Sequence, residues 1–169
     1  MTQIRFAYAE DAKIVSALGT TTFIETFGHL YKEEDLSAFL EKNHSESAYK
    51  TLLSDREWGV RIVERDGVPF GYSVAGPCTL PVPDMPENAG ELSRLYLLKE
   101  GQGSGAGERL LKTTLDWLYE RFEHVYLSVY AENFGAQRLY ARHGFEKICD
   151  YFYMVGEHAD PEWIMGRPR

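Results

Sequence analysis

A glycine-rich stretch at Gly101–Gly107 carries the clearest chemical signal in this sequence. Four of its seven residues are glycine, in strict alternation. Glycine tolerates positive φ and lets a ligand approach the main chain closely. Free N–H groups at the start of a helix bind anions. Because an apolar run at Leu92–Leu98 precedes the stretch and a helical pattern begins at Glu108, the sequence predicts a phosphate-binding loop between a strand and a helix.

Three kinds of glycine-rich loop fit this stretch to different degrees. A P-loop closes with Gly-Lys-Ser/Thr, whose lysine and hydroxyl serve the terminal phosphates and Mg²⁺, whereas Glu108 and Arg109 follow here. Gly101, Gly103 and Ala106 match the loose dinucleotide pattern G-x-G-x-x-G/A. That pattern normally opens a doubly wound domain, but this loop lies past the midpoint of the chain. A nicotinamide-dependent oxidoreductase is therefore the most distant alternative.

The third interpretation uses Gln102-x-x-Gly105-x-Gly107. This spacing resembles the Q/R-x-x-G-x-G/A motif of the GNAT (acyl-CoA N-acyltransferase) superfamily, in which the loop holds the pyrophosphate of coenzyme A. Residues 133–145 read N-F-G-A-Q-R-L-Y-A-R-H-G-F. They are similar to the second GNAT motif, N-x-x-A-x-x-x-Y-x-x-x-G-F, at every marked position. Glu91 lies eleven residues before Gln102, which is similar to the position of the catalytic glutamate in many members.

The resemblance implies attack of an amine on acetyl-CoA, with acetyl-CoA as co-substrate. A primary amine is mostly protonated near neutral pH because its pKa is about 10, so the reaction needs a base, and the leaving thiolate needs an acid. Glu91 matches the family's base, which often acts through a water. Tyr140 matches a family tyrosine close to the CoA sulfur, and a phenol can donate to a thiolate. Simpler roles are a solvated Glu91 paired with Arg94 or Lys99, and a core Tyr140.

The same resemblance implies a set of contacts with coenzyme A. The loop would bind pyrophosphate through main-chain N–H groups, the backbone N–H at the strand end would polarise the acetyl carbonyl, and an asparagine would contact the pantetheine arm or cap a helix. The residues are Leu97, Gln102, Gly103, Ser104, Gly105, Ala106, Gly107 and Asn133. Strand alternation predicts that Glu91, Ser93, Leu95 and Leu97 share one face and Leu92, Arg94, Tyr96 and Leu98 the other.

The acceptor side carries a weaker signal. Phe27, His29 and Tyr31 could line an acceptor pocket or fill the core between helix and sheet. The resemblance to bacterial small-amine and polyamine-type enzymes implies a small-molecule amine acceptor such as a polyamine. A protein N-terminus or lysine, and a non-catalytic acyl-CoA sensor on the same fold, are the alternatives. The five histidines show no metal-ligand spacing, so no metal is expected.

Composition bounds the remaining choices. A chain of 169 residues is expected to be a single N-acetyltransferase domain over residues 1–169. Its net charge of -8 argues against a nucleic-acid or anionic-membrane partner. The two cysteines lack the spacing of a disulfide framework or zinc site. Without a signal-peptide core or a long apolar run, we expect a cytoplasmic protein.

The elements that must position these residues follow from periodicity. We expect strands at 4–8, 58–64, 68–75, 90–98, 125–130, 145–155 and 163–165, and helices at 11–26, 33–41, 105–121 and 134–143, with 45–54 extending the second helical region. Asp66-Gly67 predicts a hairpin turn, and the proline-rich segment 77–86 predicts a loop. The fold class is α/β (α+β): a mixed, mostly antiparallel sheet of six to seven strands with about four helices. Tyr151, Phe152, Tyr153 and Trp163 could be core or a homodimer edge.

Overall fold

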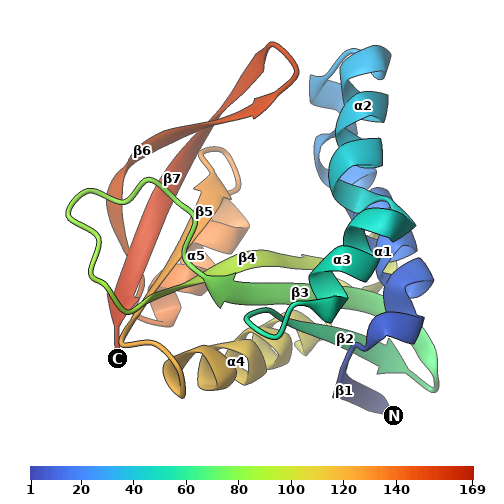
Figure 1. Cartoon of the computed structure of the whole chain (residues 1–169), viewed down its shortest axis with the longest axis horizontal. Coiled ribbons are helices and arrows are strands. Elements are labelled where there is room, and N and C mark those ends of the chain that lie inside the picture. The colour runs from blue at the N-terminus through green and yellow to red at the C-terminus, as the bar shows by residue number, and fades with distance from the viewer.

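A seven-stranded sheet organises the computed structural model of the chain, which describes residues 1–169. The strand order is β1-β2-β3-β4-β5-β7-β6, and only the β4–β5 pair is parallel, so the predicted fold class is confirmed (Figure 1). The strands are β1 (Thr2–Phe6), β2 (Gly59–Arg65), β3 (Val68–Pro77), β4 (Ala89–Leu97), β5 (His124–Tyr130), β6 (Glu146–Val155) and β7 (His158–Pro168). The helices are α1 (Ala12–Phe27), α2 (Glu33–His44), α3 (Glu46–Ser54), α4 (Ala106–Tyr119) and α5 (Phe134–Arg142), with short 3-10 turns at Ala9–Asp11, Gly28–Leu30 and Lys99–Gly101.

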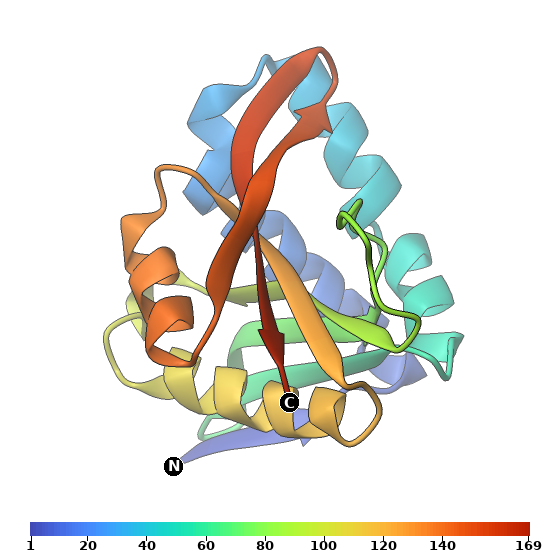
Figure 2. The same ribbon diagram turned by 90° about the vertical axis from the view of Figure 1, so that its left-hand side faces the viewer.

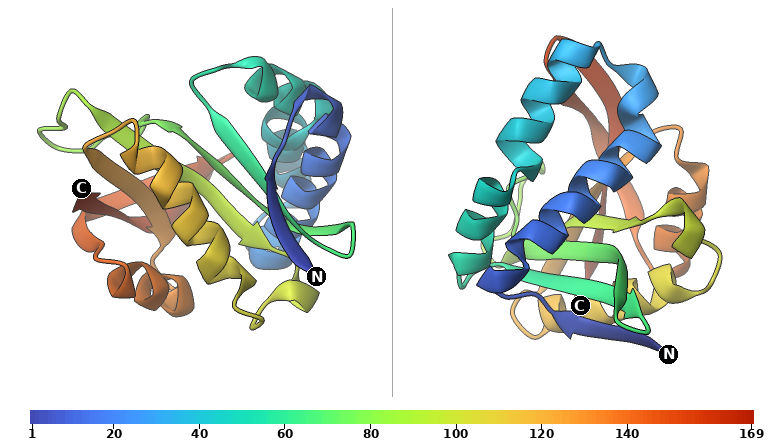
Figure 3. Two further views of the ribbon diagram at one scale, coloured as in Figure 1. Left: turned by 90° about the horizontal axis from the view of Figure 1, so that it is seen from below. Right: turned by 90° about the vertical axis from the view of Figure 1, so that its right-hand side faces the viewer.

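The helices cover the sheet from both sides. α1 and α3 pack on each other and on the face of β3, and α4 crosses the opposite face over β2 to β5 (Figure 3). The second predicted helix region is divided at Ser45, whose extended backbone ends α2 and whose hydroxyl accepts a hydrogen bond from Ala48 N at 3.1 Å. A serine in this position is a favourable N-cap, and it makes α3 a separate, fifth helix.

β4 and β5 pair only briefly before they separate. Their register runs from Ala89 opposite His124 to Glu91 opposite Tyr126 and then stops. Figure 2 shows β5 rising away from β4 beside the β6–β7 hairpin. The edge of β4 from Leu92 to Leu97 is left without a strand partner on that side. Backbone N–H and C=O groups on such an edge need other partners, so the split is a natural place for a ligand to bind.

A β-bulge in β4 changes which side chains share a face. Val74 pairs with Arg94 but Ala75 pairs with Leu92, so Ser93 is the extra residue. A bulge shifts the alternation by one residue. Leu92 and Leu95 both pack against α4, whereas Arg94 lies on the α1–α3 side with Glu91, whose pKa it helps to lower. The alternation predicted through β4 was therefore wrong, because sequence spacing does not reveal a bulge.

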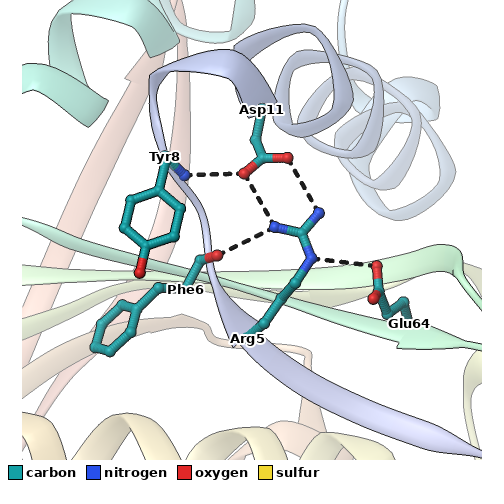
Figure 4. A network of polar contacts seen from close by, with 5 residues as sticks. All are labelled: Arg5, Phe6, Tyr8, Asp11 and Glu64. Carbon is teal, nitrogen blue, oxygen red and sulfur yellow. Dashed lines mark hydrogen bonds and ion pairs between the residues drawn. The ribbon is translucent and has the colours of Figure 1, made fainter.

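One arginine on β1, which pairs with β2 along its length, connects this strand to Glu64 of β2 and to Asp11 in the turn before α1 (Figure 4). Arg5 Nη1 and Nη2 donate to the two carboxylate oxygens of Asp11, both at 3.0 Å, and Nε donates to Glu64 at 3.3 Å. The Asp11 carboxylate also accepts from Tyr8 N at 2.9 Å. The hydrogen bonds from Arg5 lower the pKa of Asp11. A bidentate arginine with two acidic partners is the ordinary way to hold a guanidinium at the edge of a core.

Other local predictions are confirmed by backbone geometry. Asp66 and Gly67 both have positive φ, 50° and 81°, as a two-residue hairpin turn requires. Gly144, with φ 86°, follows the end of α5. β7 is longer than the predicted 163–165 and lies between β5 and β6. β6 is thereby an edge strand, and it exposes Ile148, Phe152 and Met154. No helix has both the length and the apolar character needed to cross a membrane.

Candidate functional site

The glycine-rich loop connects the end of β4 to the start of α4, as predicted. Gly101 packs so tightly that an added Cβ would lie 2.2 Å from Phe70 Cδ2. The Gln102 side chain donates to the Leu97 carbonyl at 3.2 Å, and the Ser104 hydroxyl donates to the Gly101 carbonyl at 2.8 Å. These bonds hold the loop in shape from within. The two side chains thus support the loop's own backbone.

The outer surface of this loop fits an anion. Gly103 and Gly105 have φ of 78° and 81°, and a Cβ on either would meet no atom within 4 Å. α4 begins at Ala106, and its N-cap, Gly105, supplies no side-chain acceptor for the first N–H groups. Free N–H groups, a helix dipole and open space above two glycines together make a suitable cradle for a phosphate.

Asn133 caps a helix, which is one of the two roles predicted for it. Its Oδ1 accepts from Ala136 N at 3.2 Å and caps α5. The neighbouring Gln137 amide donates to the carbonyls of Tyr130 and Ala131, at 3.1 and 2.9 Å. The turn between β5 and α5 is therefore well fixed. The contact of Asn133 with pantetheine stays a prediction.

Tyr140 is buried on α5, facing the sheet. Its ring packs edge-on against Phe145 with centroids 6.1 Å apart, and no hydrogen-bond partner within the chain affects the pKa of its hydroxyl. Burial raises the pKa of Tyr140, because a phenolate is poorly solvated in an apolar environment. The phenol therefore keeps its proton at neutral pH, which a proton donor to a thiolate needs.

Glu91 is buried at the point where β4 and β5 separate. Its Oε1 accepts from both the backbone N and the hydroxyl of Thr79, each at 2.8 Å. Burial raises the pKa of Glu91, and the hydrogen bonds from Thr79 oppose that rise. Glu91 is thus positioned by the loop after β3 and is not the solvated glutamate of the simpler interpretation. The Thr79 bonds leave Oε2 available.

A second carboxylate, which the sequence did not indicate, lies on β7. Glu162 pairs with Tyr130 on β5 and Tyr151 on β6. Burial raises the pKa of Glu162 to about 7; Ser128 opposes the rise and Asp160 adds to it. No motif marks this residue, because only the insertion of β7 beside β5 brings it to the site. A carboxylate with a pKa near 7 is suited to general-base work.

Glu162 and Tyr140 both act on Tyr96, which lies on the part of β4 that has no β5 partner. Burial raises the pKa of Tyr96 on β4, and both Glu162 and Tyr140 add to that rise. Both groups therefore lie close to the Tyr96 hydroxyl. Glu162 on β7 and Tyr140 on α5 thus supply a carboxylate with a raised pKa and an un-ionised phenol, the two groups that amine attack followed by thiolate release requires.

Of the three residues predicted to line an acceptor pocket, only Phe27 and Tyr31 lie near the split in the sheet. Phe27 is buried and packs edge-on against Tyr96 and Tyr130, with centroids 6.4 and 5.9 Å away. The Tyr31 hydroxyl donates to Asp160. His29 is exposed on the short turn after α1. Phe27 and Tyr31 thus border the split, and His29 does not join them.

A buried histidine–tyrosine network lies beneath α2 and α3. His44 Nδ1 is 2.8 Å from the Tyr49 hydroxyl, which donates to the Tyr72 hydroxyl at 3.3 Å. Burial lowers the pKa of His44 to about 3, and the positive charge of Arg94 adds to this effect. His44 is therefore neutral at physiological pH.

This neutral histidine predicts a specific acid sensitivity. The unfolded chain protonates His44 below its ordinary pKa of 6.5, whereas the folded chain does not until about 3. Stability is therefore lost as pH falls through that window, by about 2 kcal/mol between pH of about 7 and about 5. Urea unfolding of the wild type and His44→Gln at both pH values measures it. The stability gap between the two proteins should shrink by that amount at the lower pH, and an unchanged gap would contradict the assignment.

No group of three or more histidine, cysteine, aspartate or glutamate side chains is arranged to hold a metal ion. The two cysteines, Cys78 and Cys149, are both free thiols.

Similarity to known proteins agrees with this geometry. A solved structure, the PaiA N-acetyltransferase from Thermoplasma acidophilum in complex with coenzyme A, superposes with a TM-score of 0.78 at 18% identity, covering 100% of this chain and 99% of that one. An uncharacterized N-acetyltransferase of Mycobacterium tuberculosis is 28% identical over 163 residues, 93% of this chain and 97% of that protein. The spermine/spermidine N(1)-acetyltransferase of Bacillus subtilis is 37% identical over only 57 residues, 32% of this chain and 38% of that protein.

The sequence model of the Acetyltransferase (GNAT) family matches residues 23–145, which include the glycine-rich loop and the Asn133–Phe145 motif. The split between β4 and β5 and the anion cradle at the start of α4 lie within the same segment. The chain therefore belongs to the GNAT family and is an acetyl-CoA-dependent N-acetyltransferase.

Proposed function

We propose that this enzyme acetylates the primary amine of a small molecule, with Tyr140 as the acid and a buried carboxylate as the base. The observation that carries the proposal is the split between β4 and β5, around which the fold gathers the buried Tyr140 of α5 and the carboxylates of Glu91 on β4 and Glu162 on β7. Cationic polyamines belong to this acceptor class, and the short match to a spermine/spermidine acetyltransferase supports including them.

Separate residues would bind the cofactor, accept a proton from the amine and give a proton to the leaving sulfur. When bound, acetyl-CoA supplies an activated acyl group as a thioester, and the main chain of residues 101–107 would hold its pyrophosphate. The ionised carboxylate of Glu91 or Glu162 accepts a proton from the ammonium and frees the nitrogen lone pair. As the new C–N bond forms and the C–S bond breaks, the Tyr140 phenol gives its proton to the leaving sulfur, and the second proton that the nitrogen loses restores the phenol. The products are an N-acetylated amine and the free CoA thiol.

Thiol release from acetyl-CoA tests this proposal directly. The panel should contain spermidine, spermine, amino acids, aminoglycosides and short peptides. We expect amine-dependent release with a small-molecule class. Release with peptides alone would favour a protein acceptor, whereas CoA binding without release by any acceptor would favour a sensor.

The glycine cradle gives a further prediction with a matched control. Gly105→Ala places a methyl group in the open space above the loop and forces alanine to adopt φ of 81°. We expect a stability loss of about 1 kcal/mol and roughly tenfold weaker acetyl-CoA binding, because the methyl and the strained backbone disturb the N–H cradle. Thermal unfolding and calorimetric titration with acetyl-CoA measure the two effects.

Gly67→Ala is the control for this variant. Gly67 also has φ of 81° and no atom within 4 Å of an added Cβ, but it lies in the β2–β3 hairpin. Its alanine variant should lose similar stability and bind acetyl-CoA normally. Equal losses of affinity in both variants would show that the effect on binding comes from general strain.

A further inference from the structure

Arg94 is a half-buried cation that forms no ion pair. Its Nη1 donates to the Tyr49 hydroxyl at 2.7 Å, and its guanidinium carbon lies 5.5 Å from the centroid of the Tyr49 ring. It makes no ion pair with any carboxylate of the chain. Arg5, by contrast, is more exposed and still bonds both Asp11 and Glu64. An arginine cannot escape its charge by losing a proton, so the unpaired state of Arg94 needs an explanation.

The groups around Arg94 do not balance its charge. Tyr49 contacts His44 and Tyr72, and this network is neutral because burial lowers the pKa of His44 and raises that of Tyr72. Glu91 is on the same face but directs Oε1 to Thr79. A buried charge without a counter-ion destabilises a fold. Arg94 lowers the pKa of Glu91 but forms no ion pair with it, so its guanidinium is left to bind an anion.

Arg94 also lines a pocket. The cavity has a volume of about 290 Å³ and lies where α2 and α3 meet the sheet. Donor groups predominate among its polar side chains: Arg94, Lys42, Asn43, Tyr49 and Thr51, with one carboxylate, Asp55. Two cations and several neutral donors suit a carboxylate group, for which a planar guanidinium is the preferred partner.

The pocket adjoins the proposed reaction centre. The bulge at Ser93 turns Arg94 to the face that carries Glu91. On the β6–β7 hairpin, the Tyr153 ring packs edge-on against Phe39 of α2, with centroids 5.8 Å apart, and belongs to the same aromatic cluster as Tyr130, the strand partner of Glu162. Burial raises the pKa of Tyr153 to about 12; Arg94 opposes the rise and Glu162 adds to it. The proposed anion-binding pocket and the strand that carries Glu162 thus meet at the same cluster of aromatic side chains.

We infer that the acceptor is an amine that also carries a carboxylate, with its amino group near Glu162 and its carboxylate bound by Arg94. Free amino acids and related amino-carboxylates fit this description, and polyamines do not. The inference rests on the proposed function, which it narrows to one acceptor class. Arg94 would act as a specificity determinant, because it would bind the carboxylate of the acceptor and take no part in the proton transfers.

Matched pairs of acceptors test the inference. Each pair differs by one carboxylate: glycine with methylamine, phenylalanine with phenethylamine, and ornithine with putrescine. Thiol release should give a higher kcat/KM for the carboxylate-bearing member of at least one pair by about 30-fold, which corresponds to about 2 kcal/mol. That magnitude is typical of hydrogen bonds to a charged group.

Variants separate recognition from support of the fold. Arg94→Gln should abolish the preference through a higher KM for the carboxylate-bearing acceptor, and Arg94→Lys should restore part of it. Arg61→Gln removes another guanidinium, which stacks on the Phe6 ring at 4.0 Å and does not line this pocket, so it should retain the preference. Calorimetric binding of the same acceptor pairs to the protein with coenzyme A gives a second readout that does not need turnover.

The outcomes are distinct for the two proposals. Release with amines that lack a carboxylate, unaffected by Arg94→Gln, would overturn the carboxylate assignment and leave the transferase proposal standing. Release with no acceptor would count against the small-molecule proposal. In that case, selective binding of carboxylate-bearing compounds that disappears in Arg94→Gln would still support the anion-binding site. A wild-type protein without such selective binding would overturn the proposed site. If Arg94→Gln does not fold, the behaviour of Arg94→Lys and the wild-type pairs decides the matter.

Discussion

Replacing Tyr140 with phenylalanine should lower kcat by about 100- to 1000-fold while the KM for acetyl-CoA changes little. Loss of a positioned general acid has an effect of this order. No hydrogen-bond partner within the chain affects the pKa of the phenol, so its removal leaves no buried partner unsatisfied, and the free energy of unfolding should change by less than about 0.5 kcal/mol. Steady-state kinetics and urea unfolding of Tyr140→Phe measure both quantities.

Tyr119→Phe is the matched control for this experiment. The Tyr119 hydroxyl donates to the Arg167 carbonyl at 2.9 Å, away from the split in the sheet. Its removal should lower stability by about 1 kcal/mol and leave kcat unchanged. Tyr140→Phe should therefore lose activity and keep its stability, whereas Tyr119→Phe should lose stability and keep its activity. An unchanged kcat in Tyr140→Phe would exclude this tyrosine as the acid.

Replacing Glu162 with glutamine should lower kcat/KM by about 100-fold or more at high pH and change the shape of the pH profile. A carboxylate accepts a proton only when ionised, and burial raises the pKa of Glu162 to about 7. Activity that depends on it is therefore absent well below that pH and complete above it. The wild-type-to-variant ratio should rise with pH and level off above about 7. The ratio removes the titration of the amine itself, because both enzymes share that acceptor.

Glu91→Gln provides the comparison. Burial raises the pKa of Glu91 as well, but its Oε1 is already engaged by two hydrogen bonds from Thr79. If Glu162 is the base, Glu91→Gln should keep the wild-type pH profile and lose activity only through disturbance of the Thr79 loop. The reverse result, with the pH dependence lost in Glu91→Gln and retained in Glu162→Gln, would return the role of base to Glu91.

The sequence by itself determined the family, the fold class and the local backbone of the glycine-rich loop and of α5. Those features are local in the chain: alternating glycines set the loop at Gly103 and Gly105, Asn133 caps α5, and Gly144 terminates it. Local backbone preferences act over a few residues, so spacing within one segment was enough to predict them. The hairpin at Asp66-Gly67 was predictable for the same reason.

Only the tertiary structure decided the acceptor side. The bulge at Ser93, which turns Arg94 toward Glu91, depends on pairing with β3. Glu162 enters the site because β7 lies between β5 and β6. The pKa values of Tyr140 and Glu162 are set by burial among segments distant in sequence. Strand order, register shifts and desolvation are properties of contacts across the whole chain, and a pattern within one segment carries no record of them.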